Sequence, residues 1–278
     1  MKSINTKLFS VICIVILVMT TLCGCSSGGD SGADPDEPVA TNGDIRKLMV
    51  SHTLVVGVTD FEPLDYMLDD GTWTGFDAEL ACAFGDFLGV NVQFVEIDWD
   101  KKVELLDNGK IDCIWNGMTK TDELDRSISL SSPYLYNSQV IVMKSDQFAK
   151  YDSIDKCNHL LFAVESGSAG KSLAQDYNYR TIFCDTQKDA LISVSEGRCD
   201  AAIIDNLMAA SMTGEGNEFS NLSYDYPLSS EEFVVGFRKT SPLTNEVNAF
   251  FNEYFGTDSA KKLGDKYNLI DAMVHPYN

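Results

Sequence analysis

Strand-like and helix-like segments alternate along the first part of this chain, and that alternation limits the folds open to it. Apolar, strand-like runs occur at 54–58, 90–97 and 111–115, and they are separated by amphipathic segments at 75–88 and 103–106. Within 75–88, Asp77 is the expected N-cap of the helix. Strands that alternate with helices predict a parallel sheet covered by helices. The expected fold class is therefore α/β.

The same alternation returns in the second half of the chain. Strand-like runs occur at 139–143, 160–164, 179–184 and 201–204, with helical patterns between the last three. A further strand and helix are expected at 233–237 and 244–255. The chain therefore predicts two α/β units of similar construction.

The stretch 111–134 joins a strand, a glycine loop and a helix start. The buried strand-like run ends at Asn116-Gly117, a polar loop is expected next, and Thr121 has the properties of a helix N-cap. The first N–H groups of a helix have no intrahelical acceptor, so they favour an anion at that end. This stretch is a candidate ligand site.

The N-terminal residues have the pattern of a targeting segment. Lys2 and Lys7 precede an apolar run at 8–22 that is short for a membrane span. Leu22-Cys23-Gly24-Cys25 resembles a bacterial lipobox, which implies a signal peptide at 1–24 and a lipid on Cys25. Residues 25–43 are rich in Gly, Ser, Asp and Pro, so they are expected to be a solvated tether. A non-cleaved anchor helix is the alternative.

Charge and cysteine content exclude several functions. Without the two leader lysines, 19 Lys and Arg stand against 42 Asp and Glu, a formal charge of −23, which disfavours nucleic acid as a partner. Five of eight cysteines lie beyond the leader and anchor, and no CxxC motif suggests a metal or redox site. Cys82, Cys113 and Cys199 are expected in the core, whereas pairing of Cys157 with Cys184 stays open.

Seven short motifs occur in the order and spacing of one protein family. They resemble the polar amino-acid-binding family of extracellular solute-binding proteins (family 3), the receptors of ABC importers. The match spans about 53–269. The motifs are Phe61-Glu62-Pro63, GFDAEL at 75–80, GKIDCIWNGMT at 109–119, Ser132-Pro133-Tyr134, ESGSAG at 165–170, GRCDAAIID at 197–205 and VVGFRK at 234–239.

The resemblance implies a periplasmic-binding-protein-like fold. In this family two α/β lobes are joined by a two-strand hinge, and the ligand binds in the cleft between them. The strands that cross between the lobes would fall near 136–142 and 231–234. Lobe 1 would then comprise 44–138 plus 233–278, and lobe 2 would comprise 139–232.

The resemblance also implies ligand-binding residues in lobe 1. Phe61 and Trp99 match two rings that sandwich the ligand side chain, although both fit a purely structural role as core aromatics. Asn116, Gly117 and Thr119 match the loop that receives the ligand's amino and carboxylate groups through carbonyl, N–H and hydroxyl.

Lobe 2 would supply the other half of the site. Ser168 and Ala169 match backbone donors to the ligand carboxylate at a helix N-terminus. Asp205 matches the carboxylate that holds the ligand ammonium, although an Asp at a strand end is also a common cap. Glu165 either lines the cleft or is an exposed loop acid.

One position departs from the family pattern. The arginine that clamps the ligand carboxylate is replaced here by Leu124. Arg126 is a candidate carboxylate partner, but two residues on a helix turn it about 200° away. Lys120 is a second candidate, as a point charge. The departure leaves open a ligand without a free carboxylate.

The function that the resemblance implies is capture of a small polar solute. The protein would be a lipid-anchored, extracytoplasmic monomer that presents an amino acid or a derivative to an ABC permease, without a cofactor, a metal or a catalytic step. The alternatives are a small-carboxylate dehydratase on the same fold and a sensor module. The dehydratase would need Glu165 or Asp205 as its acid or base.

Overall fold

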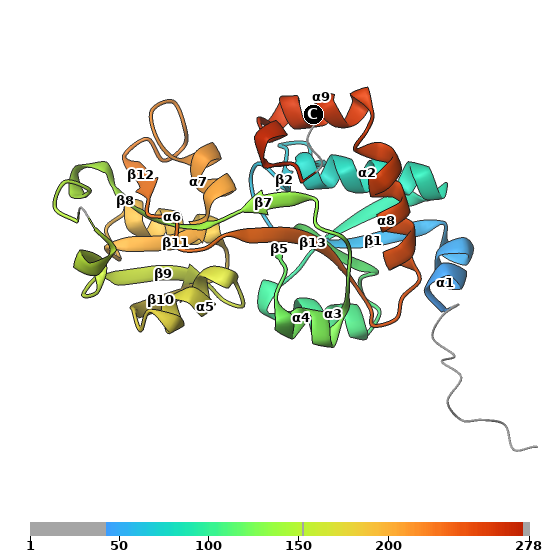
Figure 1. The fold of residues 1–278 in the computed structure, drawn as a ribbon, viewed down its shortest axis with the longest axis horizontal. Helices are drawn as coiled ribbons and strands as arrows, with labels where there is room; N and C mark the ends of the chain where they lie inside the picture. The colour runs from blue at the N-terminus through green and yellow to red at the C-terminus, as the bar shows by residue number, and fades with distance from the viewer. Residues whose placement is uncertain (1–42, 152, 275–278) are drawn as a thin grey trace, which may run out of the picture. The chain divides into compact units, whose positions relative to one another are not determined.

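Two large β-sheets, each covered by helices, and one small two-stranded sheet form the β-structure of the part of the chain that the structure describes (Figure 1). This computed structural model describes residues 43–151 and 153–274. The predicted signal peptide, the predicted lipidation site Cys25 and nearly all of the predicted tether lie outside these residues. All of the described residues belong to one compact unit, 38–278, so the boundaries of the two lobes stay a prediction.

The first sheet has the order β4-β1-β5-β13-β6, with β7 paired to β13. Strand β1 is parallel to β4 and β5, as the alternation predicted, whereas β13 is antiparallel to β5, β6 and β7. The strands are β1 (Thr53–Val58), β4 (Asn91–Glu96), β5 (Cys113–Thr119), β6 (Ser129–Leu130), β7 (Leu135–Asn137) and β13 (Glu231–Phe237).

The helices of this half contact the sheet or each other. Helix α2 packs on β4 and β5, α1 on β1, and α8 on β13. A small hairpin precedes α2. These elements are α1 (Gly43–Ser51), β2 (Tyr66–Met67), β3 (Trp73–Thr74), α2 (Phe76–Leu88), α3 (Lys102–Asp107), α4 (Asp122–Ser127), α8 (Leu243–Tyr254) and α9 (Asp258–Tyr267).

The second sheet has the order β10-β9-β11-β8-β12. Its first three strands are parallel, and β8 is antiparallel to β11 and β12. Helices α5 and α6 both pack on β9 and β11. The elements are β8 (Gln139–Lys144), β9 (Leu161–Glu165), α5 (Ala169–Asp176), β10 (Arg180–Cys184), α6 (Gln187–Ser195), β11 (Ala201–Asp205), α7 (Asn206–Met212) and β12 (Leu222–Asp225).

Two short connections join the sheets. Strand β7 of the first sheet is followed after Ser138 by β8 of the second, and β12 of the second sheet is followed by β13 of the first. Strands β7 and β13 pair side by side, with Asn137 opposite Glu231 (Figure 1). The sheets are therefore connected close to the two predicted crossings.

The core of the first half surrounds β5. Trp115 is fully buried, and its ring centroid lies 5.9 Å from Phe84 of α2, 5.8 Å from Phe251 of α8 and 6.3 Å from Tyr134. Burying such rings contributes about 1.5–3 kcal/mol each. Because α2 and α8 both contact Trp115, the core fixes the position of β5, whose end lies at the site described below.

The prediction that Asp77 is the N-cap of its helix is wrong. Gly75, with φ 122°, is the N-cap of α2, and no side chain caps this helix. The carboxylate of Asp77 is instead buried, and its Oδ2 accepts the Gly117 N–H at 2.7 Å and the Tyr134 hydroxyl at 2.6 Å. The polar loop expected after Asn116-Gly117 is also wrong, because pairing with β13 extends β5 to Thr119.

All five cysteines of the described chain are free thiols. Cys157 and Cys184, whose pairing was open, are both unpaired. Cys113 and Cys199 are buried as expected, whereas Cys82 is exposed because it lies on the outer face of α2. Burial raises the pKa of the Cys113 thiol well above its ordinary range.

Asp65 is a buried carboxyl group whose ionisation should make the stability of the protein depend on pH. Neither of its oxygens has a hydrogen-bond partner among the described residues, and burial, followed by the charge of Asp77, raises its pKa well above the ordinary value. The pKa of Asp65 is higher in the folded than in the unfolded state, so its neutral form is favoured by folding. The contribution of Asp65 to stability is therefore fully present below about pH 4, the unfolded-state pKa, and is lost as the pH rises through the folded-state pKa.

We therefore expect Asp65→Asn to raise the melting temperature more at pH 8 than at pH 4. The amide cannot ionise, and each unit of pKa shift it removes is equivalent to about 1.4 kcal/mol, or about 3–6 °C. Thermal unfolding across this pH range measures the difference, with exposed Asp69→Asn as the control. A gain that does not vary with pH would contradict an ionisable, unpaired Asp65.

Candidate functional site

A pocket of about 800 Å³ is lined by residues from the elements of both sheets. Its wall includes the end of β5, helix α4, the start of α5 and the end of β11. Arg126 and all eight residues singled out from the sequence line it: Phe61, Trp99, Asn116, Gly117, Thr119, Ser168, Ala169 and Asp205. Their roles toward a ligand remain a prediction.

Polar groups at the end of β5 already have partners within the protein. The Asn116 side chain accepts the Thr59 N–H at 2.7 Å and donates to the Thr59 hydroxyl at 2.8 Å. The Gly117 N–H donates to Asp77 Oδ2 at 2.7 Å. The Thr119 hydroxyl donates to Glu231 Oε2 at 3.0 Å. This part of the wall is therefore a rigid, hydrogen-bonded strand.

The two predicted aromatic residues are both buried, and each has a neighbour. The Phe61 ring meets Phe233 edge-on, with centroids 6.3 Å apart. The Lys102 ammonium lies over the Trp99 ring, 4.5 Å from its centroid. A cation over an indole face is attracted by the ring quadrupole. One face of Trp99 is therefore occupied by a protein cation, which the sequence analysis missed.

The start of α5 is capped by Ser168 at the edge of the pocket. Its Oγ accepts the Lys171 N–H at 3.1 Å and donates to the Glu165 carbonyl at 2.8 Å. Because the first turn of a helix has more N–H groups than intrahelical acceptors, this end carries a partial positive charge. Ser168 and Ala169 thus bring an anion-favouring helix end to the pocket.

Asp205 is buried and held by three side-chain amides. Its Oδ1 accepts from Gln139 Nε2 at 2.6 Å and from Asn137, and its Oδ2 accepts from Gln187. Burial, followed by the charge of Glu231, raises the pKa of Asp205 to about 7, although the amide hydrogen bonds oppose this shift. These amides gave no sequence signal, because they come from β7, β8 and α6 and only the fold brings them to Asp205.

Glu165 is a second buried acid of the same pocket. Its side chain is 3% exposed, so it is not an exposed loop acid. Burial, followed by the charge of Asp205, raises its pKa to about 8, whereas Lys102 lowers it. Two buried carboxyls in the wall of one pocket favour a cation near them, because a cation relieves both desolvation and mutual repulsion.

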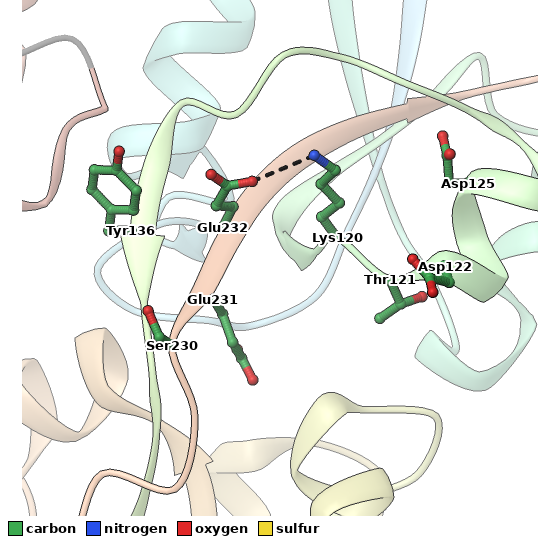
Figure 2. A pocket seen from close by; sticks show the side chains of 8 residues that line it. All are labelled: Lys120, Thr121, Asp122, Asp125, Tyr136, Ser230, Glu231 and Glu232. Atoms are coloured by element: carbon green, nitrogen blue, oxygen red, sulfur yellow. Dashed lines mark hydrogen bonds and ion pairs between the residues drawn. The ribbon is translucent and has the colours of Figure 1, made fainter.

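Lys120 does not line this pocket. It borders a second pocket of about 370 Å³, where its ammonium lies 3.4 Å from Glu232 Oε2 (Figure 2). Figure 2 shows this pocket between α4 and the paired strands β7 and β13. Lys120 therefore lies at this second pocket and not in the lining of the larger one.

Leu124 and Arg126 both line the larger pocket. The expectation that Arg126 faces away is wrong, because α4 has only six residues and more than one of its faces borders the opening. Arg126 is exposed, whereas Leu124 packs against the apolar cluster that includes Trp99. Three cations line the pocket: Lys102, Arg126 and Lys171.

Residues 43–151 and 153–274 hold neither a metal-binding cluster nor a membrane-spanning helix. In these ranges no three His, Cys, Asp or Glu side chains are placed to hold a metal ion. No helix in them is both long and apolar enough to cross a membrane.

Two helix-covered β-sheets are joined by short connections, and residues from the elements of both line one polar pocket. This arrangement is a periplasmic-binding-protein-like fold. The family model for bacterial extracellular solute-binding proteins, family 3, matches residues 54–270. The chain belongs to this family.

Individual relatives agree with this assignment. The chain is 25% identical over 266 residues to the arginine-binding extracellular protein ArtP of Bacillus subtilis (strain 168), covering 94% of this chain and 96% of that protein. A histidine-bound ABC transporter substrate-binding protein from Streptococcus pneumoniae is 27% identical, with a TM-score of 0.77 and coverage of 84% and 100%. The ancestral amino acid-binding protein AncCDT-1, a precursor of cyclohexadienyl dehydratase, is 28% identical, with a TM-score of 0.74 and coverage of 80% and 98%.

Proposed function

We propose that this protein captures a small zwitterionic solute, an amino acid or a close derivative, in the 800 Å³ pocket and presents it to an ABC permease. The observation that carries the proposal is that the pocket has acidic groups suited to a cation and a helix end suited to an anion. Asp205 and Glu165 favour an ammonium group, and the start of α5 favours a carboxylate. The names of the arginine-binding and histidine-bound relatives support the same ligand class.

The proposal includes a lipid anchor at Cys25, based on Leu22-Cys23-Gly24-Cys25. A lipid on this cysteine would hold a monomeric receptor at the outer face of the cytoplasmic membrane. We expect the wild-type protein to incorporate a radiolabelled fatty acid in growing cells and Cys25→Ser to incorporate none, as followed by gel fluorography of the immunoprecipitated protein. Equal labelling of the two proteins, or labelling of neither, would contradict a lipid on Cys25.

A thermal-shift screen of the mature protein tests the proposed ligand class. The probes are L-arginine, L-histidine, L-glutamine and L-cystine, together with amines and carboxylates that carry only one of the two groups. A ligand that binds only the native state raises the unfolding midpoint by mass action. A shift with at least one free amino acid is expected. Shifts with amines alone, or with carboxylates alone, would overturn the zwitterion proposal.

A dehydratase-like enzyme is the second candidate. It is favoured by two pocket carboxyls, Asp205 and Glu165, whose pKa values of about 7 and 8 would suit a general acid or base near neutral pH. The similarity to a precursor of cyclohexadienyl dehydratase also supports this candidate. Recovery of the bound ligand from denatured protein separates the two. Unchanged ligand supports a receptor, and a dehydrated product supports an enzyme.

A further inference from the structure

Lys102 places a buried ammonium group in the wall of the pocket. The residue is only 9% exposed, and Nζ donates to the Trp99 carbonyl at 3.1 Å and to the Gly167 carbonyl at 2.9 Å. An ammonium has three donors in roughly tetrahedral directions. The two carbonyls use two of them, so one N–H is left to bind another acceptor.

The charge of Lys102 lacks a close counterion. No carboxylate within 43–151 or 153–274 lies within 4.0 Å of Nζ, although Glu165, Asp100 and Glu123 contribute favourable longer-range interactions and Lys171 opposes them. Burial lowers the pKa of Lys102 to about 8. A buried cation without an ion pair is costly, so an arriving anion would gain more here than at an exposed lysine.

The position of Lys102 relative to α5 identifies the kind of anion. Its bond to the Gly167 carbonyl places the ammonium next to the segment that leads into Ser168 and Ala169, where the helix end favours negative charge. Lys102 comes from α3 and Ala169 from α5, so the two face the pocket from different halves of the fold. A carboxylate bound between them would receive donors from both sides.

We propose that Lys102 is the anchor for the ligand's carboxylate, acting together with the first turn of α5. This inference rests on the proposed function, since it names the group that recognises one end of the zwitterion. The ligand class is accordingly solutes with a free carboxylate. Leu124 contributes an apolar surface to the pocket, and Arg126 lies at its exposed margin.

The test compares free amino acids with their carboxamides. Binding of L-arginine and L-argininamide, and of L-histidine and L-histidinamide, is measured by calorimetry at pH 6.5, where the α-amino groups stay protonated. Wild-type protein is expected to prefer the acid by about 30-fold or more, as for a buried charge pair. Lys102→Met should reduce that preference to less than about 5-fold, and Lys102→Arg, which keeps the charge, should largely retain it.

Lys101→Met is the matched control. Lys101 is the preceding residue, but it is exposed, pairs with Asp98 at 2.6 Å and does not line the pocket, so the acid preference should be unchanged. If Lys102 only ties the two halves together, its loss should weaken acid and amide equally. Equal weakening, or loss of the preference in Arg126→Met instead, would overturn the proposal and leave the proposed function intact. Failure of wild-type protein to bind any free amino acid would overturn the proposed function itself.

Discussion

Replacing Asp205 with alanine is expected to weaken binding of an ammonium-bearing solute by about 2–5 kcal/mol, which corresponds to a loss of roughly 30-fold to several thousand-fold. The carboxylate is buried and oriented by amides of Asn137, Gln139 and Gln187, so it would meet a ligand in a fixed position. Its removal would leave the ammonium buried without a counterion. Calorimetry with the tightest amino acid from the thermal-shift screen measures the change.

The pH dependence of binding gives the same prediction a second readout. The pKa of Asp205 is about 7 because the group is buried and lies near Glu231, with Glu165 a further acid in the pocket. An ammonium binds the ionised form, so wild-type affinity should rise between pH 6 and pH 8. Asp205→Asn should flatten this rise, whereas Asp185→Asn, which removes an exposed acid, should not. Unchanged affinity in Asp205→Ala would remove Asp205 from the site.

Much of the fold could be predicted because its signals are local. The strands predicted at 54–58, 160–164 and 201–204 correspond to β1, β9 and β11 within one residue at each end. A short run of apolar, β-branched residues is by itself typical of a buried strand, so these strands can be read from the local sequence. The N-cap at Thr121 is confirmed, because its side chain accepts the Leu124 N–H within the same turn. Features that depend on neighbours a few residues away are readable from sequence.

The wrong predictions concern partners that are distant in the sequence. Asp77 looked like a cap, yet its partners are Gly117 and Tyr134, 40 and 57 residues away. The end of β5 looked like a loop because its pairing with β13 joins residues more than 100 positions apart. Lys102 gave no signal, since a lysine in a helical segment is usually exposed and only the Gly167 carbonyl shows its direction.

The two buried acids, Asp205 and Glu165, show why the pocket is the part of the structure that is hardest to predict from the sequence. Local patterns place Asp205 at a strand end and Glu165 at the end of another, but neither pattern reveals that both are buried in one wall. Their raised pKa values follow from that shared burial rather than from residue type. Burial of ionisable carboxyls costs stability, and such a cost is typical of binding sites that take a ligand of opposite charge.

Gly117→Ala is expected to destabilise the protein by about 2–5 kcal/mol and to disturb the pocket as well. Gly117 has φ 55°, where an L-residue costs about 1–2 kcal/mol. A Cβ there would lie 2.5 Å from Phe61 Cε1, 2.7 Å from Leu64 Cδ1 and 3.1 Å from Phe233 Cε2, and overpacking of this kind costs about 1–3 kcal/mol more. Thermal unfolding should show a melting temperature lower by roughly 5–15 °C.

Gly109→Ala separates the backbone cost from the cost of the steric contacts. Gly109 also has a positive φ, 76°, but no atom would lie within 4 Å of an added Cβ. It should show the backbone cost alone, so the difference between the variants measures the contact with Phe61, Leu64 and Phe233. Relief of that contact would move the Phe61 ring, which lines the pocket, and binding should fall in Gly117→Ala but not in Gly109→Ala. Equal destabilisation of the two variants would mean that the wall around Gly117 yields to an added methyl group, which a rigid β5 end would not allow.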